Sequence, residues 1–556
     1  MTASSGNQRS ESAANRQIPD DIAERRFDVI VVGAGINGAG IARDAAMRGL
    51  DVLLIDKGDI GGATTASPTR LIHGGLRYLE YYEFSLVRES LREREHLLKI
   101  APHLVHPLGF TVPIYAGWRR KPLTIRAGMM LYDILSYDKS LPRHEMLSRD
   151  EVLRREPGLS ADGLLAAAFY YDAQVDYPER LTFENALSAH EHGAAIITHA
   201  RVDRLLHDAN RVNGIVFTDL LSGQEYSTQA QLVINAAGPW VDTVLTGIEG
   251  QRYIGGTKGT HIVVHIFPGA PSAALYVEAQ ADGRPYFIVP WTGRYLIGTT
   301  DIRFEGDLDH IVPDESEISY LLGETERVIP VSGLSRDKVL YAYSGVRPLP
   351  YKEEGSAGSI TRRHIIHDHA PDFDGLISII GGKITTYRNL AEETVDLAFE
   401  KLGRISPDCK TATIPLPGAA TGDLKRFNEN FIARSELPEP AARRLLTIYG
   451  TRAWNVLELA DEDDRLRRPL GKETNALAAE IPFAFRQEHA LTLTDVLARR
   501  TMLGLDDAVG LDVVEPAATI AQQMLGWSDA RAADEIAAYR RHTQDLLPRT
   551  ESTNGD

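Results

Sequence analysis

The sequence predicts an α/β fold, α+β overall, in which a parallel-sheet domain is combined with an inserted antiparallel-sheet domain and a C-terminal helical domain. Three observations predict it. A buried strand at 28–32 runs into a glycine-rich turn and a helical stretch. Two later buried strands, at 231–236 and 376–380, end abruptly in small residues. Beyond residue 418, Ala, Leu, Arg and Glu recur at helical spacing. The 556 residues suffice for roughly three to four domains.

The composition is that of an ordinary globular protein and narrows the function classes. Hydrophobic residues make up 43%, charged residues 25%, and the formal net charge is −17. Such an acidic chain repels nucleic acid, so no nucleic-acid partner is expected and an anionic ligand requires a focused basic pocket. The single cysteine, Cys409, excludes an intrachain disulfide framework and cysteine-built metal sites, and no metal is predicted.

The N-terminal segment, residues 1–26, is rich in Ser, Asn, Arg, Glu and Asp and has no apolar core. We expect it to be a flexible tail and not a secretory signal. No uninterrupted apolar stretch reaches the roughly 18 residues that a membrane span requires. The expected location is therefore the cytoplasm, with peripheral attachment to the inner face of the plasma membrane as an option.

A dinucleotide fingerprint follows the first strand. The strand at 28–32 leads into GAGING (33–38), then a helical stretch at 39–48, then a second strand at 51–55 that ends at Asp56. This is the required context of strand, glycine turn, helix, strand and a carboxylate about 20 residues on. It predicts a Rossmann-like domain that binds a dinucleotide; the alternative is a glycine-rich turn in a sheet without a nucleotide.

Each position of the fingerprint has a physical role. Gly33 permits the tight turn, Gly35 lets the backbone approach a pyrophosphate, and Gly38 lets helix and strand pack closely. The helix N-terminus, where Asn37 lies, supplies N–H donors and the positive end of a dipole. Asp56 can accept hydrogen bonds from an adenosine ribose.

Two segments far along the chain favour FAD over NAD. The strand at 231–236 ends in Ala237-Gly238, where the backbone can pack against a cofactor. The strand at 376–380 breaks at Gly381-Gly382 and enters a predicted helix beginning at Lys383, which includes Thr385. A helix N-terminus and a lysine there would stabilise the negative charge of a reduced flavin. The alternative is that both are further turns of one α/β sheet.

Four motifs carry a family resemblance. They are GGATTASPTRLIHGGLRYLE at 61–80, NAAGPW at 235–240, SGVRPLP at 344–350 and GGKITTYR at 381–388. Together they resemble the FAD-dependent, quinone-linked glycerol-3-phosphate dehydrogenases, which belong to the D-amino-acid oxidase-like flavoproteins. The resemblance runs from about 27 to 392 and continues at 480–501 in that family's helical domain.

The chain departs from the family pattern at three positions. Many relatives carry Ser and Lys where this chain has Pro68 and Arg70, and Glu where it has Asp56. Because Pro68 has no backbone N–H, no flavin-phosphate contact is assigned to its nitrogen. Asp56 can make the same ribose bonds with a shorter reach.

The resemblance implies oxidation of sn-glycerol 3-phosphate to dihydroxyacetone phosphate with FAD as cofactor. The C2 hydrogen would pass as hydride to flavin N5, and the electrons would leave to a membrane quinone. It also implies cofactor contacts at Thr69, Arg70, His73 and Gly74, with His73 as a flavin neighbour. Gly382 and Lys383 would lie at the pyrimidine end of the isoalloxazine ring. The oligomeric state is left open, with a homodimer as one option.

This reaction needs cations for a phosphate dianion. Arg77 and Arg347 are the candidates, because a guanidinium fork matches phosphate geometry and both lie in short Gly- or Pro-containing segments suited to pocket walls. The alternative for each is a salt-bridged surface arginine. Tyr78, beside Arg77, either donates its hydroxyl to the substrate or packs.

The reaction also needs a base for the C2 hydroxyl proton. His261 opens an apolar strand in KGTHIVV (258–264), and a neutral imidazole there can take the proton. Lys383 is the alternative base, or a stabiliser of the forming carbonyl oxygen, because a desolvated amine can lose its proton. The segment 299–301 is expected to line the same cavity.

The predicted FAD-binding domain is discontinuous. It comprises 27–105, 165–250 and 335–400, with the substrate-binding domain of antiparallel strands inserted as 106–164 and 251–334. The C-terminal helical domain is predicted over 410–545.

Two alternative functions remain open. One keeps the fold: an oxygen-reducing glycerol-phosphate oxidase or an amino-acid or amine oxidase, since arginine pairs also bind carboxylates. The other is a flavoprotein of RNA modification, which the acidic charge disfavours.

A route to a membrane quinone is also predicted. Trp118 and the basic run 119–121 precede an apolar, helix-like run at 127–135. Because Trp favours the headgroup level and Lys and Arg favour anionic lipid, we expect salt-sensitive peripheral association through Trp118 to Lys121. The alternative is an ordinary helix packed in the substrate-binding domain.

Overall fold

The computed structural model describes residues 18–248, 250–353, 360–472 and 474–547. Most of the predicted tail, residues 1–17, lies outside the described residues. Its last part does not behave as a tail: Ile22 is buried in a core beside Phe27, and Arg25 donates to Asp51 at 2.8 Å. The prediction of a tail up to residue 26 is therefore corrected for residues 18–26.

The first sheet carries the predicted glycine motif. It has eight strands in the described part of the chain, with the order β17-β18-β10-β1-β2-β7 and the hairpin of β8 and β9 joined to β10. Their bounds are β1 Arg26–Val32, β2 Val52–Ile55, β7 Ala195–Ile197, β8 Ala200–Asp208, β9 Arg211–Asp219, β10 Glu225–Asn235, β17 Ile365–Asp368 and β18 Leu376–Ile380.

Parallel pairing positions the site. Strands β1, β2, β10 and β18 are mutually parallel, so their carboxyl ends meet at one edge of the sheet. Toward these carboxyl ends the strands are apolar runs covered on both faces, which is typical of parallel sheets. On one face they share a core with three helices, α1 (Ile36–Met47), α5 (Pro178–Glu191) and α8 (Tyr387–Lys401). The predicted Rossmann-like fold is confirmed.

The second sheet is mostly antiparallel. In the described chain it has ten strands in the order β15-β11-β14-β13-β12-β4-β6-β3, with β16 paired to β11 and β5 to β6. Their bounds are β3 Leu71–Ile72, β4 Val105–Tyr115, β5 Glu145–Ser148, β6 Leu164–Val175, β11 Thr257–Val264, β12 Ala274–Glu278, β13 Pro285–Trp291, β14 Arg294–Gly298, β15 Ile302–Arg303 and β16 Val339–Arg347.

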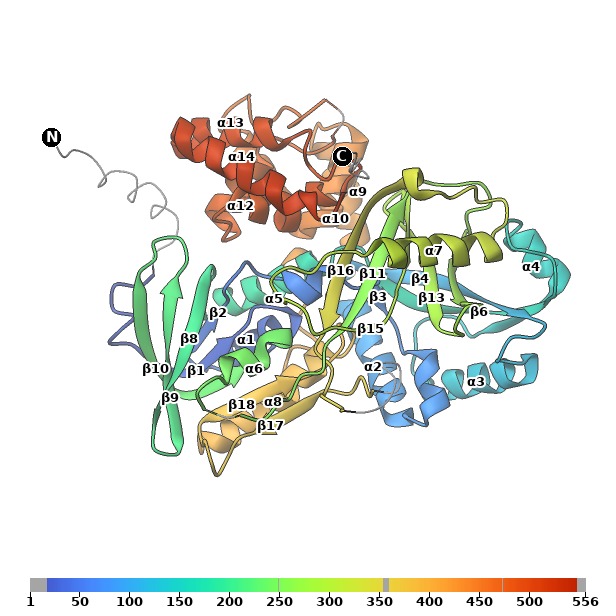
Figure 1. Ribbon diagram of the computed structural model, residues 1–556. Helices are drawn as coiled ribbons and strands as arrows, with labels where there is room; N and C mark the ends of the chain where they lie inside the picture. The colour runs from blue at the N-terminus through green and yellow to red at the C-terminus, as the bar shows by residue number, and fades with distance from the viewer. Residues whose placement is uncertain (1–17, 249, 354–359, 473, 548–556) are drawn as a thin grey trace, which may run out of the picture.

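Helices cover both faces of this second sheet (Figure 1). On one face α4 (Arg149–Arg155) and α7 (Glu315–Val328) share a core with Ile262 and Val264 of β11. On the other, α2 (Phe84–Ile100) and α3 (Pro122–Leu135) share a core with Val263. Alternate residues of β11 thus face opposite cores, as strand geometry requires.

Two predicted domain boundaries differ from the sheet pairing. The boundaries at 165 and 335 assign β6 and β16 to the FAD-binding domain, whereas β6 pairs along its length with β4 and β16 pairs with β11, both in the second sheet. The hydrophobic pattern of a strand shows that it is buried but not which distant strand it pairs with. We therefore assign both strands to the inserted sheet.

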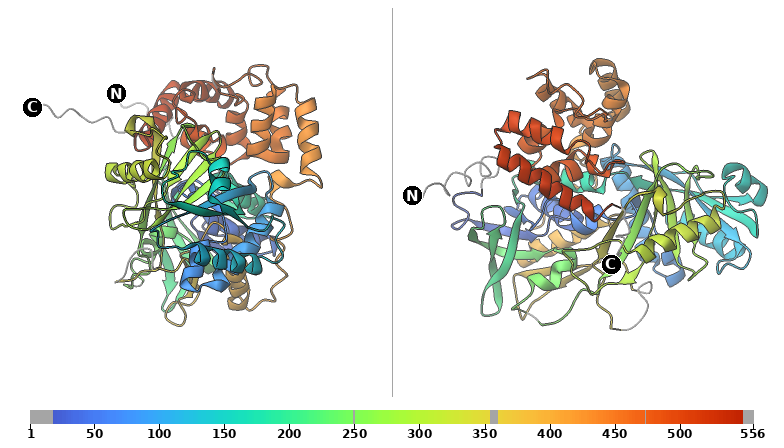
Figure 2. Two further views of the ribbon diagram at one scale, coloured as in Figure 1. Left: turned by 90° about the vertical axis from the view of Figure 1, so that its right-hand side faces the viewer. Right: turned by 45° about the horizontal axis from the view of Figure 1, so that its top comes forward.

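The C-terminal segment is helical, as predicted. Figures 1 and 2 show its orange and red helices gathered at one end of the molecule, above both sheets. Their bounds are α9 Leu424–Arg434, α10 Glu439–Tyr449, α11 Ala453–Ala460, α12 Glu480–Gln487, α13 Val514–Leu525 and α14 Asp529–Gln544, with a π-helical turn, η8, at Asp495–Arg500. Nowhere in the described residues is there a helix with the length and apolar character needed to traverse a bilayer.

Candidate active site

The glycine turn after β1 is built by close backbone contact. Gly33 has φ +105°, and a Cβ on it would lie 2.6 Å from the carbonyl oxygen of Ala236. A Cβ on Gly38 would lie 1.8 Å from the carbonyl oxygen of Gly33. The turn lies directly against the end of β10, where Ala237 and Gly238 follow. Only glycine therefore fits at these two positions.

The end of β18 reaches the same place. Asn37 Nδ2 donates to the carbonyl oxygen of Gly381 at 3.3 Å, and a Cβ on Gly382 would lie 2.9 Å from Asn37 Nδ2. Asn37 Oδ1 is buried and has no hydrogen-bond partner among the described residues. Three segments, each more than a hundred residues from the next, thus meet at the N-terminus of α1, beside this buried oxygen.

Asp56 closes the other side of the turn. Its Oδ2 accepts from Ala34 N at 2.6 Å and its Oδ1 from Gly58 N at 2.7 Å. Burial raises the pKa of Asp56, and the two backbone donors oppose this. Each carboxylate oxygen keeps a second lone pair, so the ribose contact predicted for Asp56 remains compatible with these bonds.

Thr65 supplies a contact that sequence reasoning missed. Its Oγ1 accepts from Ile36 N at 3.1 Å, at the start of α1, where Gly35 has no side chain to cap the helix. Thr65 lies in the family segment at 61–80, and its place in that segment was the available signal.

Two residues of that segment, Thr69 and Arg70, have different surroundings. Thr69 Oγ1 is 2.9 Å from His261 Nε2. Arg70 is fully buried, donates to both carboxylate oxygens of Glu179 at 2.9 and 3.0 Å, and lies over the ring of Trp291. A guanidinium engaged in this way holds the second sheet to α5, and the predicted cofactor contact of Arg70 stays a prediction.

His73 and Gly74 are held through their backbone. His73 N donates to Thr385 Oγ1 at 3.3 Å, and Gly74 N donates to the hydroxyl of Tyr132 at 3.0 Å. Burial lowers the pKa of His73 to about 4, so its imidazole is neutral at pH 7. The Thr385 contact joins the segment after β3 to the loop after β18.

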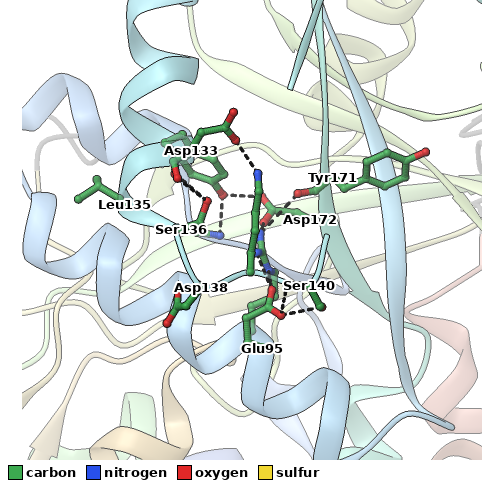
Figure 3. Close-up of polar contacts among 12 residues, drawn as sticks. Glu95, Asp133, Leu135, Ser136, Asp138, Ser140, Tyr171 and Asp172 are labelled. Atoms are coloured by element: carbon green, nitrogen blue, oxygen red, sulfur yellow. Dashed lines mark hydrogen bonds and ion pairs between the residues drawn. The ribbon is translucent and has the colours of Figure 1, made fainter. Parts of the chain in front are cut away.

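A buried hydrogen-bond network fixes Tyr132, whose hydroxyl accepts from Gly74 N. The Tyr132 hydroxyl donates to Asp172 at 2.7 Å, and Asp172 also accepts from Arg94 at 2.5 Å. Figure 3 shows Asp172 and Glu95 in this network, which continues to Ser140. Satisfied buried networks of this kind fix local geometry.

A cationic cluster lies beside Tyr78. Arg347 donates to Asp301 Oδ1 and to Thr299 Oγ1, both at 3.1 Å, and Arg362 is 3.3 Å from Asp301 Oδ2. Burial raises the pKa of Tyr78. Three nearby guanidinium groups, those of Arg362, Arg77 and Arg347, partly oppose this rise. The predicted residues Arg77, Tyr78 and Arg347 are thus brought together.

Arg362 completes the cluster and was missed by sequence reasoning. Its Nη1 is buried and has no hydrogen-bond partner within the described part of the chain. The signal was weak, a pair of basic residues in ITRR (360–363) outside any quoted motif. Arg347 and Arg362 both contact the carboxylate of Asp301, and Arg77 lies near it, so these four side chains carry an excess of positive charge, as a dianionic ligand requires.

Lys383 lies in a turn and not in a helix. The predicted helix begins only at Tyr387, so Lys383 precedes it by one turn. Its Nζ donates to Ser90 Oγ at 2.7 Å and lies 4.4 Å from the centre of the Tyr78 ring. Burial lowers the pKa of Lys383 to about 7, so its amine is largely neutral in mildly alkaline solution.

His261 lies on β11, beside Thr69. Its ring stacks on Tyr343 with 5.1 Å between centroids, and its Nδ1 is buried without a hydrogen-bond partner among the described residues. Burial lowers the pKa of His261 well below its usual value, and the charge of Arg347 adds to this. Its imidazole is therefore neutral, and its predicted role as the base stays a prediction.

These residues fit FAD. The glycine cradle at the N-terminus of α1 suits a pyrophosphate, and Asp56 suits a ribose. Asn37 Oδ1, beside that cradle, is a buried acceptor without a partner in the part of the chain that the structure describes. The loop after β18 then leads to the cationic cluster, where a substrate anion can bind.

We expect Gly38→Val to abolish FAD binding. The new side chain would clash with the carbonyl oxygen of Gly33 and open the turn. The measurement is the ratio of flavin to protein absorbance after purification. Gly323→Ala in α7, where a Cβ meets nothing within 4 Å, is the control and should retain normal FAD content. Normal FAD content in Gly38→Val would contradict this account of the turn.

Known proteins share both the sequence and the fold. A family profile described as FAD dependent oxidoreductase matches residues 28–388, and one described as C-terminal domain of alpha-glycerophosphate oxidase matches residues 409–532. The chain is 45% identical over 548 residues to a glycerol-3-phosphate dehydrogenase of Synechocystis sp., covering 96% of this chain and 99% of that one. It is 35% identical to glycerol-3-phosphate dehydrogenase 2 of Mycobacterium bovis, covering 93% and 88%.

A solved structure agrees. The glycerol-3-phosphate dehydrogenase of Bacillus halodurans, complexed with FAD, superposes with a TM-score of 0.76 at 26% identity, covering 95% of this chain and 96% of that one. Fold, glycine cradle and sequence similarity over nearly the whole length thus agree, and the chain belongs to the family of FAD-dependent glycerol-3-phosphate dehydrogenases.

Proposed function

We propose that the protein oxidises sn-glycerol 3-phosphate to dihydroxyacetone phosphate and passes the electrons to a membrane quinone. The observation that carries the proposal is the cluster of Arg77, Arg347 and Arg362 around Tyr78, with Asp301 as its carboxylate. Relatives named glycerol-3-phosphate dehydrogenase support the substrate.

The arginines would bind the phosphate. Arg362 Nη1 lacks a partner among the described residues, and Arg347 is held in place by Asp301 and Thr299, so its fork is oriented before the substrate arrives. Preorganised charge of this kind binds an anion without reorganisation. Bound FAD would supply the two-electron acceptor, taking the C2 hydrogen at flavin N5.

The C2 hydroxyl proton needs an acceptor among this chain's residues. Lys383 Nζ is near Tyr78 of the cationic cluster, and its lowered pKa leaves a neutral amine that can accept a proton near pH 7. His261 is neutral over a wider range but already bonds Thr69 through Nε2. We therefore propose Lys383 as the base and His261 as the second candidate.

The test is anaerobic mixing of the purified flavoprotein with glycerol 3-phosphate. Bleaching of the flavin's visible absorbance, with dihydroxyacetone phosphate as product, is expected. Reoxidation by a quinone analogue without hydrogen peroxide would support the quinone route. Stoichiometric peroxide in air would instead indicate an oxidase, and bleaching by amino acids but not by glycerol 3-phosphate would overturn the substrate.

The residues of the basic run proposed to contact lipid differ in their surroundings. Trp118 is half-buried with its ring 4.7 Å from that of Tyr115, and Arg120 forms ion pairs with Glu80 and Glu278. A paired guanidinium and a packed indole are not free to enter a headgroup layer. Arg119 and Lys121 are exposed, so a lipid contact through these two residues stays a prediction, and we propose a further contact on the helix that follows.

Helix α3 presents an apolar stripe to solvent. Leu123 is 80% exposed, Met130 54% and Ile134 65%, and Tyr137 continues the line beyond the helix. Exposed Tyr82 lies in the neighbouring segment before α2. Arg126, also exposed, adds positive charge beside this stripe. An apolar helix face with a basic neighbour suits shallow insertion into a membrane surface, where the quinone is dissolved.

We expect the triple change Leu123→Gln, Met130→Gln and Ile134→Gln to reduce sedimentation with anionic liposomes while activity with a soluble dye is retained. The reason is the loss of the apolar surface that inserts among lipids. Ile405→Gln, which changes an exposed apolar residue of the loop after α8, is the control. Undiminished sedimentation of the triple variant would place the membrane contact elsewhere.

The homodimer stays a prediction.

A further inference from the structure

The loop between β2 and the short helix η1 (Ala63–Ala66) has two sides. On one side it carries Asp56, and Gly61 N donates to the carbonyl oxygen of Ala34 at 3.0 Å within the glycine turn. On the other side it contacts η8 of the C-terminal helical domain. The loop 56–62 therefore lies between the cofactor motif and a domain that begins more than 350 residues later in the sequence.

Asp59 is the centre of the contact with η8. Its side chain is fully buried. It accepts from Arg500 Nη1 and Nη2 at 2.8 and 2.7 Å, and from Arg499 Nε at 2.6 Å. Buried carboxylates held by two arginines tolerate the loss of a partner poorly, because an uncompensated charge is left in the interior.

A second contact between η8 and this loop runs through His199. His199 Nε2 is 3.0 Å from Asp495 Oδ2, also in η8. The backbone N–H of His199 donates to the carbonyl oxygen of Gly58 at 2.8 Å, and Gly58 N in turn donates to Asp56. The helical domain thus reaches the ribose-binding carboxylate through two residues.

The π-helical turn explains why one short element makes both contacts. Asp495, Arg499 and Arg500 are at positions i, i+4 and i+5, which lie together on the wider turn of a π-helix. Arg499 also donates to Asp495 at 2.8 Å, so the two links are joined. In an ordinary α-helix Asp495 and Arg500, five residues apart, would point about 140° apart.

We propose that the C-terminal helical domain is a cofactor-retention element. Through Arg499, Arg500 and Asp495, which act as positioning residues, it holds the loop 56–62 in the conformation that binds FAD. Docking of this domain and binding of FAD are then thermodynamically coupled, each favouring the other. The coupling depends on FAD binding and not on the substrate that is oxidised.

The test measures FAD affinity, not turnover. The full-length protein is stripped of FAD, and the dissociation constant is determined from the quenching of flavin fluorescence on rebinding. Arg500→Gln and Arg499→Gln should weaken FAD binding by roughly 5- to 150-fold, the range of typical coupling between sites. Arg500→Lys, which retains one charged contact to Asp59, should recover part of the affinity.

A matched control changes another contact of the same domain. Arg294 of β14 pairs with Asp506 and Asp507 of the C-terminal domain but contacts the second sheet and not the loop. Arg294→Gln should leave FAD affinity unchanged. An equal loss in this variant would show that any weakening of the domain interface releases FAD, and would overturn the specific role of η8.

A double-mutant cycle tests the route through Asp59. Asp59→Asn should lower FAD affinity at least as much as Arg500→Gln, because Asp59 also accepts from Arg499, and the double variant should lose little more than Asp59→Asn alone. If a variant does not fold, the Arg500→Lys and Asp495→Asn variants carry the same test. Parental FAD affinity in the folded Arg499 and Arg500 variants would overturn the proposal.

Discussion

Arg347→Ala is expected to raise the KM for glycerol 3-phosphate by roughly a hundredfold. The fork of Arg347 is held by Asp301 and Thr299, and its removal deprives a phosphate dianion of a charge-assisted partner in a partly desolvated site. Such a loss costs about 3 kcal/mol, which is roughly a hundredfold in affinity. FAD content should stay normal because the glycine cradle is untouched.

The measurement is steady-state KM together with the dissociation constant of a phosphate analogue. Arg347→Lys should recover only part of the binding, because a lysine keeps the charge but not the planar fork. Arg327→Ala is the control, since Arg327 is half-exposed and pairs with Glu324 of its own helix, α7. A parental KM in Arg347→Ala would assign phosphate binding to Arg77 and Arg362 alone.

Local sequence was sufficient for the parallel strands β1, β2, β10 and β18 of the first sheet. The strand at 28–32, the glycines at 33–38 and Asp56 form one contiguous unit whose conformation is set by short-range backbone geometry. The loops after β10 and β18 were predicted for the same reason, because a buried strand that ends in small residues is a local signal. Their meeting with Gly33 and Asn37 then follows from parallel pairing.

The remainder depends on contacts between distant residues. Arg70 was assigned to the cofactor by its position in the family segment, but its guanidinium is taken by Glu179, more than a hundred residues away. Strand β16 was placed in the wrong sheet, since its pairing with β11 leaves no trace in its own pattern. Arg362 was missed because a pair of basic residues in a segment without a motif is usually a solvated surface feature.

The second large effect concerns the base. Replacing Lys383 by Met is expected to slow flavin reduction by about 10²- to 10⁴-fold, the usual contribution of a positioned base. In the parent, log kcat/KM should rise with pH and level off above about 7, where burial has made the amine neutral. The sign follows from the acceptor: the protonated lysine, which predominates below that pKa, cannot take the hydroxyl proton.

The substrate's own titration must be separated from that of Lys383. A phosphate monoester loses its second proton at about pH 6. The limb that this ionisation produces in the plot of log kcat/KM against pH should persist in every variant. Only the limb near pH 7 should vanish in Lys383→Met. His261→Gln is the matched comparison: its pKa lies well below 6.5, so His261 acting as base would give no limb near 7. A limb that survives in Lys383→Met, together with greatly slowed reduction in His261→Gln, would move the base to His261. Loss of the limb in Lys383→Met alone would leave His261 to orient Thr69 and the segment 61–80 to which it belongs.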